Sequence, residues 1–215
     1  MTRRKVVAFD IETMGLLHEC PLPEITCICL YDGTEAVSLR FMTDDADERA
    51  RATERVIALL DGADRIVGYN AVGFDLEFMR RSLSIDDARM REWRHKCVDP
   101  YLCALYAVGV GGSMQRMLEL NGLGSKTADG GSAITMAREG RWDELLHYCQ
   151  MDAQLVYALV THREWTRLTR HLECRFLGAP YGADFRLVAQ QAPSSSSLVP
   201  RRVAWNAIAL DAAEA

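Results

Sequence analysis

Acidic residues in three widely separated segments constrain this chain more than any other feature. Asp10 and Glu12 lie in VVAFDIETMGL, Asp75 lies in GYNAVGFDLEF, and Asp152 lies in LLHYCQMDAQL. Four carboxylates that meet at one point repel each other at neutral pH, so they need cations, and hard oxygen ligands of this kind select Mg²⁺ or Mn²⁺. A fold that gathers the three segments therefore predicts a site for divalent metal ions.

The first segment predicts a pair of carboxylates aimed the same way. Residues 5–9 form a short apolar run, typical of a buried strand. Residues two apart in a strand point to the same face. Asp10 and Glu12 are therefore expected together at the end of this strand, before a turn at residues 13–15. Because Asp-x-Glu after a strand is common, the pair alone does not define a site.

The second segment predicts a strand, a turn and a helix. The strand is expected over residues 65–69, the turn over 70–73 and the helix over 74–81. Asp75 falls in the first helical turn, where a carboxylate suits the positive end of the helix dipole. By itself, this aspartate is also an ordinary helix-start residue.

The third segment predicts a long amphipathic helix over residues 141–168, without internal proline or glycine. Tyr148 and Asp152 are four residues apart, so they lie on one face of this helix. A phenol and a carboxylate arranged in this way can meet the same metal-bound water. The structural alternative is a half-exposed helix face, and only the three segments together favour a site.

The three segments together resemble the three motifs of the DEDD 3′–5′ exonucleases, in the subgroup with tyrosine in the third motif (DEDDy). The second and third segments are most similar in sequence to the proofreading domains of family-B DNA polymerases, and the similarity spans residues 5–160. The matching residues are Asp10, Glu12 and Thr13 of the first motif, Asn70, Phe74 and Asp75 of the second, and Tyr148 and Asp152 of the third.

This resemblance implies a two-metal-ion mechanism with Mg²⁺ or Mn²⁺. Asp10, Glu12 and Asp152 are expected to hold the ion that carries the nucleophilic water. Asp10 is expected to bridge to a second ion, which Asp75 reaches directly or through water, and Tyr148 to orient the attacking water. The two ions would stabilise the attacking and leaving oxygens. The expected product is a nucleoside 5′-monophosphate released from the 3′ end of a single strand, with DNA preferred over RNA.

The resemblance also implies a set of substrate-binding residues. Thr13, Met14 and Leu16 match the stretch that contacts the terminal nucleotide, and Leu16 is either an apolar wedge against the last base or a core leucine. Asn70 matches a residue that steadies the substrate strand, although a turn-forming asparagine is an alternative. Phe74 completes the expected set.

Histidine and tyrosine are both present in the third motif. His147 lies five residues before Asp152, the interval of a sister subgroup in which histidine replaces the tyrosine, whereas Tyr148 lies four residues before it. We favour Tyr148 because the residues after it follow the polymerase type.

The rest of the pattern predicts an α/β fold, a ribonuclease-H-like (DnaQ-like) mixed β-sheet flanked by helices. Residues 24–31 and 34–42 are expected to pair as a hairpin across Asp32 and Gly33. Val98 and Asp99 are expected to form a last short strand, and Asp99 is expected to be structural rather than a fifth metal ligand. Further predictions are helices over residues 44–60, 100–108 and 113–120 and a loop over 127–131.

The length of 215 residues and the hydrophobic content of 49% fit one compact domain. We assign residues 1–190 to the exonuclease domain and residues 191–215 to a linker and tail, with a docking helix at 203–213. No apolar run approaches the length of a membrane span, and the apolar stretch near the N-terminus is too short for a signal sequence. A cytoplasmic location is the resulting expectation.

The net charge of −5 argues against strong non-specific binding to duplex nucleic acid. Lys126 lies in the Gly-rich stretch NGLGSKT, which lacks the spacing of a phosphate loop, so a contact with the substrate strand is the remaining interpretation. A cluster of basic residues after the second motif either contacts phosphates or forms a solvated helix face: Arg80, Arg81, Arg89, Arg91, Arg94 and Lys96.

The chain has seven cysteines, an odd number, without a C-x-x-C pair. This pattern predicts neither a zinc site nor a disulfide framework. Cys149 adjoins Tyr148 but is expected to point elsewhere and to have no role.

An active exonuclease is the favoured interpretation. The alternatives are a 3′–5′ exoribonuclease of the same fold, a non-catalytic module that binds nucleic acid or protein, and a structure-specific endonuclease. A binding module has no need of clustered carboxylates, which repel each other. This argues against the non-catalytic alternative.

Overall fold

A computed structural model describes residues 5–102, 105, 112–126 and 130–161. Five strands form one mixed sheet in the order β3-β2-β1-β4-β5. β1 to β3 are antiparallel neighbours, whereas β4 and β5 run parallel to β1. The sheet confirms the predicted fold class. Its strands are β1 (Val6–Thr13), β2 (Ile25–Tyr31), β3 (Ala36–Arg40), β4 (Arg65–Val67) and β5 (Cys97–Val98).

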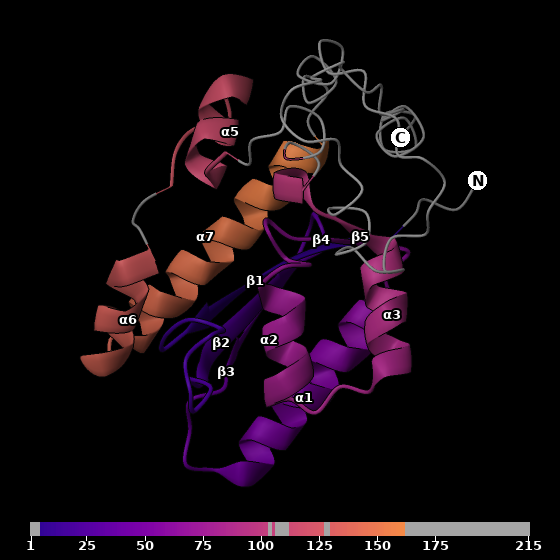
Figure 1. Cartoon of the computed structure of the whole chain (residues 1–215). Helices are drawn as coiled ribbons and strands as arrows, with labels where there is room; N and C mark the ends of the chain where they lie inside the picture. The colour runs from indigo at the N-terminus through magenta and orange to yellow at the C-terminus, as the bar shows by residue number, and fades with distance from the viewer. Residues whose placement is uncertain (1–4, 103–104, 106–111, 127–129, 162–215) are drawn as a thin grey trace.

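Helices cover both faces of the sheet (Figure 1). One face packs against α1 (Ala46–Asp61), α2 (Asp75–Ser82) and α3 (Asp87–Lys96). The other face packs against α5 (Met114–Asn121), α6 (Gly130–Arg138) and the long α7 (Trp142–Thr161). Among the described helices, none combines the length and the apolar character that a bilayer crossing requires.

The alternation of side chains along β1 assigns the acidic pair to one of these faces. Val7 and Phe9 pack with α1 to α3, whereas Ala8 packs with α5 and α7. Because successive side chains in a strand point to opposite faces, Asp10 and Glu12 share the face of Ala8. The acidic pair is therefore directed toward α7.

β1 is longer than the sequence predicts. The expected strand ended at residue 9, but pairing with β2 continues to Thr13, which lies opposite Ile25 after a bulge at Glu12 and Thr13. Asp10 and Glu12 therefore lie within the strand, where pairing with β2 holds their backbone more firmly than a loop would.

The predicted hairpin is confirmed, with Tyr31 paired to Ala36. In its loop, Asp32 Oδ1 accepts hydrogen bonds from the N–H groups of Thr34 and Glu35. Gly33 has a φ of 96°, a conformation that residues with a side chain rarely adopt. Local turn chemistry thus accounts for this part of the sheet.

The ends of the helices differ partly from the prediction. α1 agrees within two residues and begins at the N-cap Asp45. α6 begins at Gly130, so the end of the predicted loop at 127–131 is helical. Residues 100–102 and 105 are helical, as expected for the start of the helix over 100–108.

Several predictions lie outside the described residues. They are the extension of the last helix from 162 to 168, the domain boundary at residue 190, and the linker and tail over 191–215 with the docking helix at 203–213. These remain predictions.

Asp99 holds together the turn that precedes α2. Its Oδ1 accepts hydrogen bonds from the N–H groups of Asn70, Tyr101 and Leu102, and its Oδ2 accepts one from Val72. The side chain is fully buried. Asn70 has a φ of 58°, a left-handed conformation that asparagine tolerates better than most residues. Asp99 is therefore structural, as expected, and positions the segment that leads to Asp75.

We predict that Asp99→Asn lowers the free energy of unfolding by about 1–3 kcal/mol, because the amide group turns a donor toward at least one N–H group that then lacks an acceptor. Urea unfolding monitored by circular dichroism measures this loss. Asp86→Asn is the matched control. Asp86 caps α3 through Oδ1, which an amide oxygen can replace, and its Oδ2 makes only an exposed ion pair with Arg89, so the effect stays within about 1 kcal/mol. Equal losses in the two variants would contradict the structural role of Asp99.

Candidate active site

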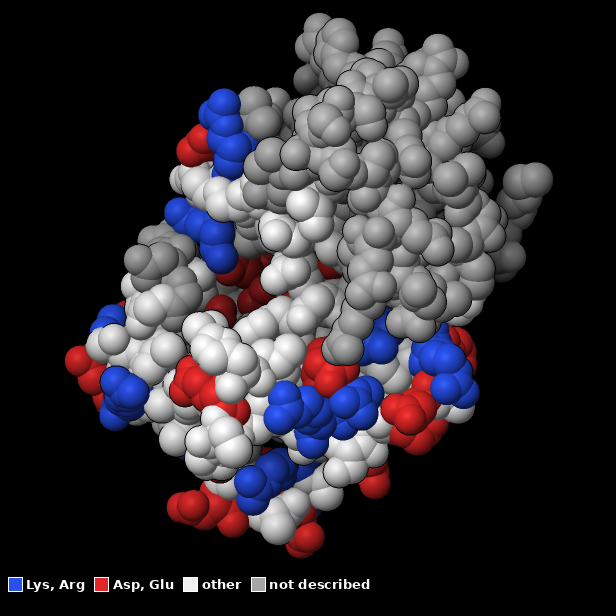
Figure 2. All heavy atoms as spheres, in the orientation of Figure 1, with Lys and Arg blue, Asp and Glu red and all other residues white. Residues whose placement is uncertain are grey.

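Three of the predicted carboxylates converge in the structure. Asp10 and Glu12 come from β1 and Asp152 from α7, and one oxygen of each lies within 4.8 Å of the others. α7 contacts both β1 and β2, which brings the third motif over the first. Acidic atoms line the floor of a hollow in the molecular surface (Figure 2). The arrangement matches what a divalent cation requires of its protein ligands.

Asp75 lies beside this group of three rather than within it. Its side chain is 6% exposed at the start of α2, and it accepts a hydrogen bond from the Ile11 backbone. Its charge acts on both Asp10 and Glu12 and raises the pKa of each. The structure thus brings all four predicted acids into one electrostatic unit.

Burial and mutual repulsion make the charged state of this unit costly. Burial, and then the charges of Glu12, Asp152 and Asp75, raise the pKa of Asp10 well above its usual value. Burial, followed by Asp152, raises the pKa of Glu12 to about 8. Burial also raises the pKa of Asp75 to about 7. Without added cations, part of the site therefore stays protonated near neutral pH.

Two carboxylate oxygens in the site show that the donor set fits a metal ion. Asp10 Oδ2 and Asp152 Oδ1 are buried and accept no hydrogen bond from the described residues. Buried polar atoms are normally paired, so these two oxygens are suited to bind a cation. Both are hard anionic oxygens, which suit Mg²⁺ or Mn²⁺.

Lys126 lies at the acidic group, a position that the sequence did not predict. Its Nζ lies 2.5 Å from Asp152 Oδ2 and 5.4 Å from the centre of the Tyr148 ring. Burial alone would lower the pKa of Lys126, but the Asp152 carboxylate raises it. Lys126 therefore supplies one permanent positive charge to the acidic group.

Glycines shape the loop that delivers Lys126. Gly122 ends α5 with a φ of 66°, and Gly124 has a φ of 91°. The N–H group of Lys126 then donates to Gln115 Oε1 over 2.7 Å, which returns the loop to α5. The Gly-rich sequence predicted a loop at this position, but it did not predict the contact of Lys126 with Asp152.

Tyr148 faces the site and His147 faces solvent. Tyr148 is 3% exposed and shares a cluster with Cys149 and Ala153, whereas the neighbouring His147 is exposed. Burial and the Asp152 charge raise the pKa of Tyr148, so its phenol keeps its proton. This register favours the tyrosine over the histidine interpretation.

The segment after β1 places Leu16 at the surface. Leu16 is 54% exposed, the largest exposure of any large apolar side chain in the described part of the chain, so the core alternative is wrong. Thr13 Oγ1 donates to the backbone oxygen of Gly15 over 2.7 Å, and Met14 packs against the buried cluster that includes Tyr148. An exposed leucine that follows the acidic pair keeps the wedge interpretation open.

Asn70 and Phe74, the substrate-binding residues predicted in the second motif, both make structural contacts in this conformation. Asn70 forms the left-handed turn and donates its N–H to Asp99. Phe74 packs against the core, with its ring centre 5.3 Å from that of Phe78. Contacts of these two residues with a substrate remain predictions.

Most of the basic cluster after the second motif is neutralised. Arg80 and Arg94 both pair with Glu77, Arg89 pairs with Asp61 and Asp86, and Lys96 pairs with Glu92. Arg81 donates to the backbone oxygen of Leu17. These pairs favour the solvated helix face over a phosphate-binding patch.

Comparisons with known proteins agree with this geometry. A solved structure, the family B DNA polymerase from the hyperthermophilic archaeon Pyrobaculum calidifontis, is similar with a TM-score of 0.56 and 16% sequence identity. The match covers 80% of this chain and 25% of the polymerase chain, so this chain spans about a quarter of that protein's length. At this identity the likeness shows a shared fold.

Among curated proteins, none matches this chain significantly. The family model described as the RNase_H superfamily matches residues 7–164. That range contains all three acidic segments and more than half of the 215 residues. The chain therefore belongs to the RNase_H superfamily.

Proposed function

We propose that this chain is a metal-dependent 3′–5′ exonuclease that removes nucleoside 5′-monophosphates from the 3′ end of single-stranded nucleic acid, with DNA preferred over RNA. The observation that carries the proposal is the convergence of Asp10, Glu12 and Asp152 next to Asp75, with Tyr148 facing the same point. The superfamily supports nuclease chemistry on a nucleic-acid substrate, and the three motifs supply the finer assignment.

The carboxylates would hold two ions of Mg²⁺ or Mn²⁺. Asp10, Glu12 and Asp152 would hold one ion, and Asp10 and Asp75 would serve the other. When bound, such ions act as Lewis acids that make water nucleophilic and stabilise the oxygens of the phosphodiester under attack. The orphaned oxygens of Asp10 and Asp152 are the structural support for this assignment.

Tyr148 would act as a hydrogen-bond donor and not as a base. Its raised pKa keeps the phenol protonated, so it can orient the attacking water or donate to a phosphate oxygen. Lys126 offsets the charge of Asp152 and lies within reach of the same space. An ammonium group there would also attract the phosphate of the terminal nucleotide.

Two observations support the preference for DNA. The motifs resemble those of the proofreading domains of family-B DNA polymerases in sequence, and the solved structure similar to this chain is named as a DNA polymerase. RNA is the second candidate, because the discrimination depends on contacts with the 2′-hydroxyl. A non-catalytic module is the third. The energetic cost of the buried acids argues against it, since a fold without metal chemistry gains nothing from them.

One assay separates these functions. Single-stranded DNA and RNA labelled at the 5′ end are incubated with the protein and Mg²⁺ or Mn²⁺, with and without chelator. A ladder that shortens from the 3′ end only when metal is present supports the proposal. Internal cuts would indicate an endonuclease, and binding without shortening would indicate a module.

We predict that Asp152→Asn lowers the exonuclease rate by on the order of 10³-fold or more, because it removes a charged metal ligand. Initial rates of 3′ shortening at saturating Mg²⁺ measure the loss. Asp143→Asn is the matched control on the same helix, where the side chain is exposed and outside the site, and its rate stays near that of the unmodified protein. Similar rates for both variants would remove Asp152 from the mechanism.

We predict that Tyr148→Phe lowers kcat by about 10²-fold, because the ring keeps its packing but loses the hydroxyl donor. His147→Ala is the control for the competing register and leaves kcat nearly unchanged. Single-turnover rates of both variants distinguish the tyrosine register from the histidine register. A large loss in His147→Ala alone would assign the third motif to the histidine subgroup.

We also predict that the metal-free protein becomes less stable as pH rises from about 5 to 8. The folded pKa of Glu12, about 8, exceeds the ordinary value of 4.5. The folded state therefore binds more protons than the unfolded state in this window, and its stability falls as pH rises. Thermal unfolding in chelator measures the trend, and saturating Mn²⁺ removes it. Glu12→Gln should make the metal-free curve less steep, with Asp10 and Asp75 contributing the remaining slope. An equally steep curve in this variant would contradict the assignment.

A further inference from the structure

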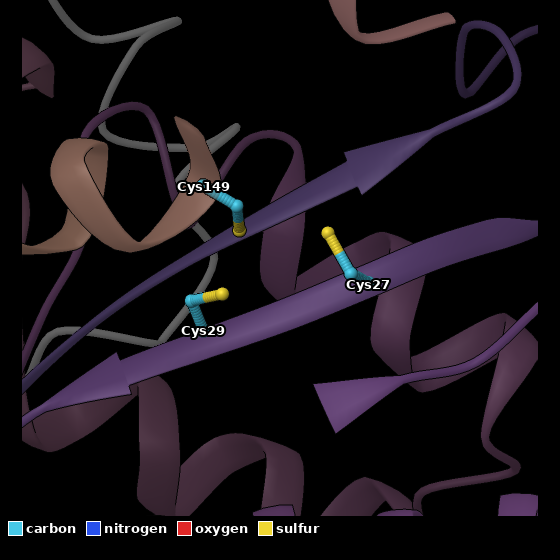
Figure 3. A group of neighbouring side chains, drawn as sticks. All are labelled: Cys27, Cys29 and Cys149. Carbon is cyan, nitrogen blue, oxygen red and sulfur yellow. The ribbon is translucent and has the colours of Figure 1, made fainter. Parts of the chain in front are cut away.

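Three buried cysteines converge directly beside the carboxylates. Cys27 and Cys29 come from β2 and Cys149 from α7, and their sulfurs lie within 4.8 Å of one another. Figure 3 shows the three side chains pointing toward a common centre between the strand and the helix. All three residues are fully buried. The odd number of cysteines and their spacing predicted no such group, and Cys149 was expected to have no role.

The cysteine group is a direct neighbour of the acidic pair on the same face of the sheet. Cys27 is paired with Glu12 and Cys29 with Asp10 across the antiparallel strands. Paired residues of this kind project to the same side. The two strands thus place two acids and two thiols side by side under α7, so the thiols form a second set of potential ligands.

Two main-chain oxygens lie against the sulfurs. Cys149 Sγ donates to the backbone oxygen of Asp10 over 3.3 Å, and Cys29 Sγ donates to that of Leu146 over 3.5 Å. The thiols are therefore held in place from both β1 and α7. These oxygens are also available as a fourth donor to an ion bound among the sulfurs.

We propose that Cys27, Cys29 and Cys149 form a structural site for a thiophilic divalent cation, Zn²⁺ in particular, distinct from the carboxylate site. Zn²⁺ prefers four ligands in a tetrahedron with Zn–S distances of about 2.3 Å, which places sulfurs about 3.8 Å apart. Starting from separations of at most 4.8 Å, each pair of sulfurs needs to approach by about 1 Å or less. Small side-chain rotations supply that movement.

The ligand type and the local charge select this class of ion. Thiolates are soft ligands that bind Zn²⁺ in preference to Mg²⁺ or Ca²⁺. With three thiolates, a divalent ion leaves one net negative charge, whereas a monovalent ion leaves two. Because four carboxylates lie nearby, the smaller residual charge is favoured. The site thus differs in chemistry from the hard-metal site beside it.

An ion at this position would fasten α7 to the central strands. Cys149 immediately follows Tyr148, and its partners lie opposite the two acids of β1. Coordination would therefore fix the helix that carries Tyr148 and Asp152 without taking part in the reaction. Its expected effect is on the stability of the fold, since an ion that binds only the folded state adds to the free energy of unfolding.

Cobalt substitution tests this proposal on the full chain. The protein is reduced with a phosphine, its free thiols are counted, and Co²⁺ is added in the presence of excess Mg²⁺, which occupies the carboxylates. We expect an intense thiolate-to-cobalt charge-transfer band that saturates at one equivalent and disappears when Zn²⁺ is added. Oxygen-bound Co²⁺ gives no such band, so the two metal sites are distinguished.

Variants assign the band to its ligands. Cys29→Ser and Cys149→Ser should each weaken Co²⁺ binding by at least about 10-fold. The control variant, Cys20→Ser combined with Cys103→Ser and Cys174→Ser, should keep the band. As a readout independent of the variants, Zn²⁺ should raise the Tm of the unmodified protein.

Two results would overturn the site. If fully reduced, folded protein shows no charge-transfer band at several equivalents of Co²⁺, the three cysteines are ordinary small core residues. If the band is lost in the control variant and kept in Cys149→Ser, the metal binds at other thiols.

Discussion

Mutual repulsion among buried carboxylates is the constraint on which the rest of this structure depends. Asp10, Glu12, Asp75 and Asp152 occupy one electrostatic unit, and burial raises the pKa of each. A fold accepts such a cluster only if other interactions hold it together. Here the sheet and α7 provide the packing, and Lys126 provides one compensating charge.

β1 carries two of these acids and also contributes to the hydrophobic core. It is central in the sheet, with β4 beside its first residues and β2 beside the rest, including the two acids. One face of the strand buries Val7, Phe9 and Ile11. The opposite face carries Ala8 in the core and then the two acids. The strand therefore combines a hydrophobic anchor with a charged site, and the alternation of side chains keeps the two apart.

The surroundings of the acids divide into two chemical regions. On one side lie Lys126 and Tyr148, whose phenol remains protonated. On the neighbouring strand and the next residue of α7 lie the thiols of Cys27, Cys29 and Cys149. Because carboxylates are hard ligands and thiolates are soft ones, the two groups select different ions despite their proximity. In the two proposals, the carboxylates are catalytic and the thiols fasten the helix that completes the site.

The sequence by itself determined what depends on local rules. The alternation in β1, the turn chemistry at Asp32 and Gly33, and the four-residue interval between Tyr148 and Asp152 are local features. Together with the resemblance of the three motifs, they predicted the fold class and the four acids. Tertiary structure decided what depends on distant segments. Pairing with β2 extended β1 past Glu12, Lys126 approached Asp152, and Leu16 became exposed. The cysteine group required both strand register and helix packing, because residues separated by more than a hundred positions meet there. Periodicity along a chain reports the direction of a side chain within its own element, but only the packing of elements determines what that side chain meets.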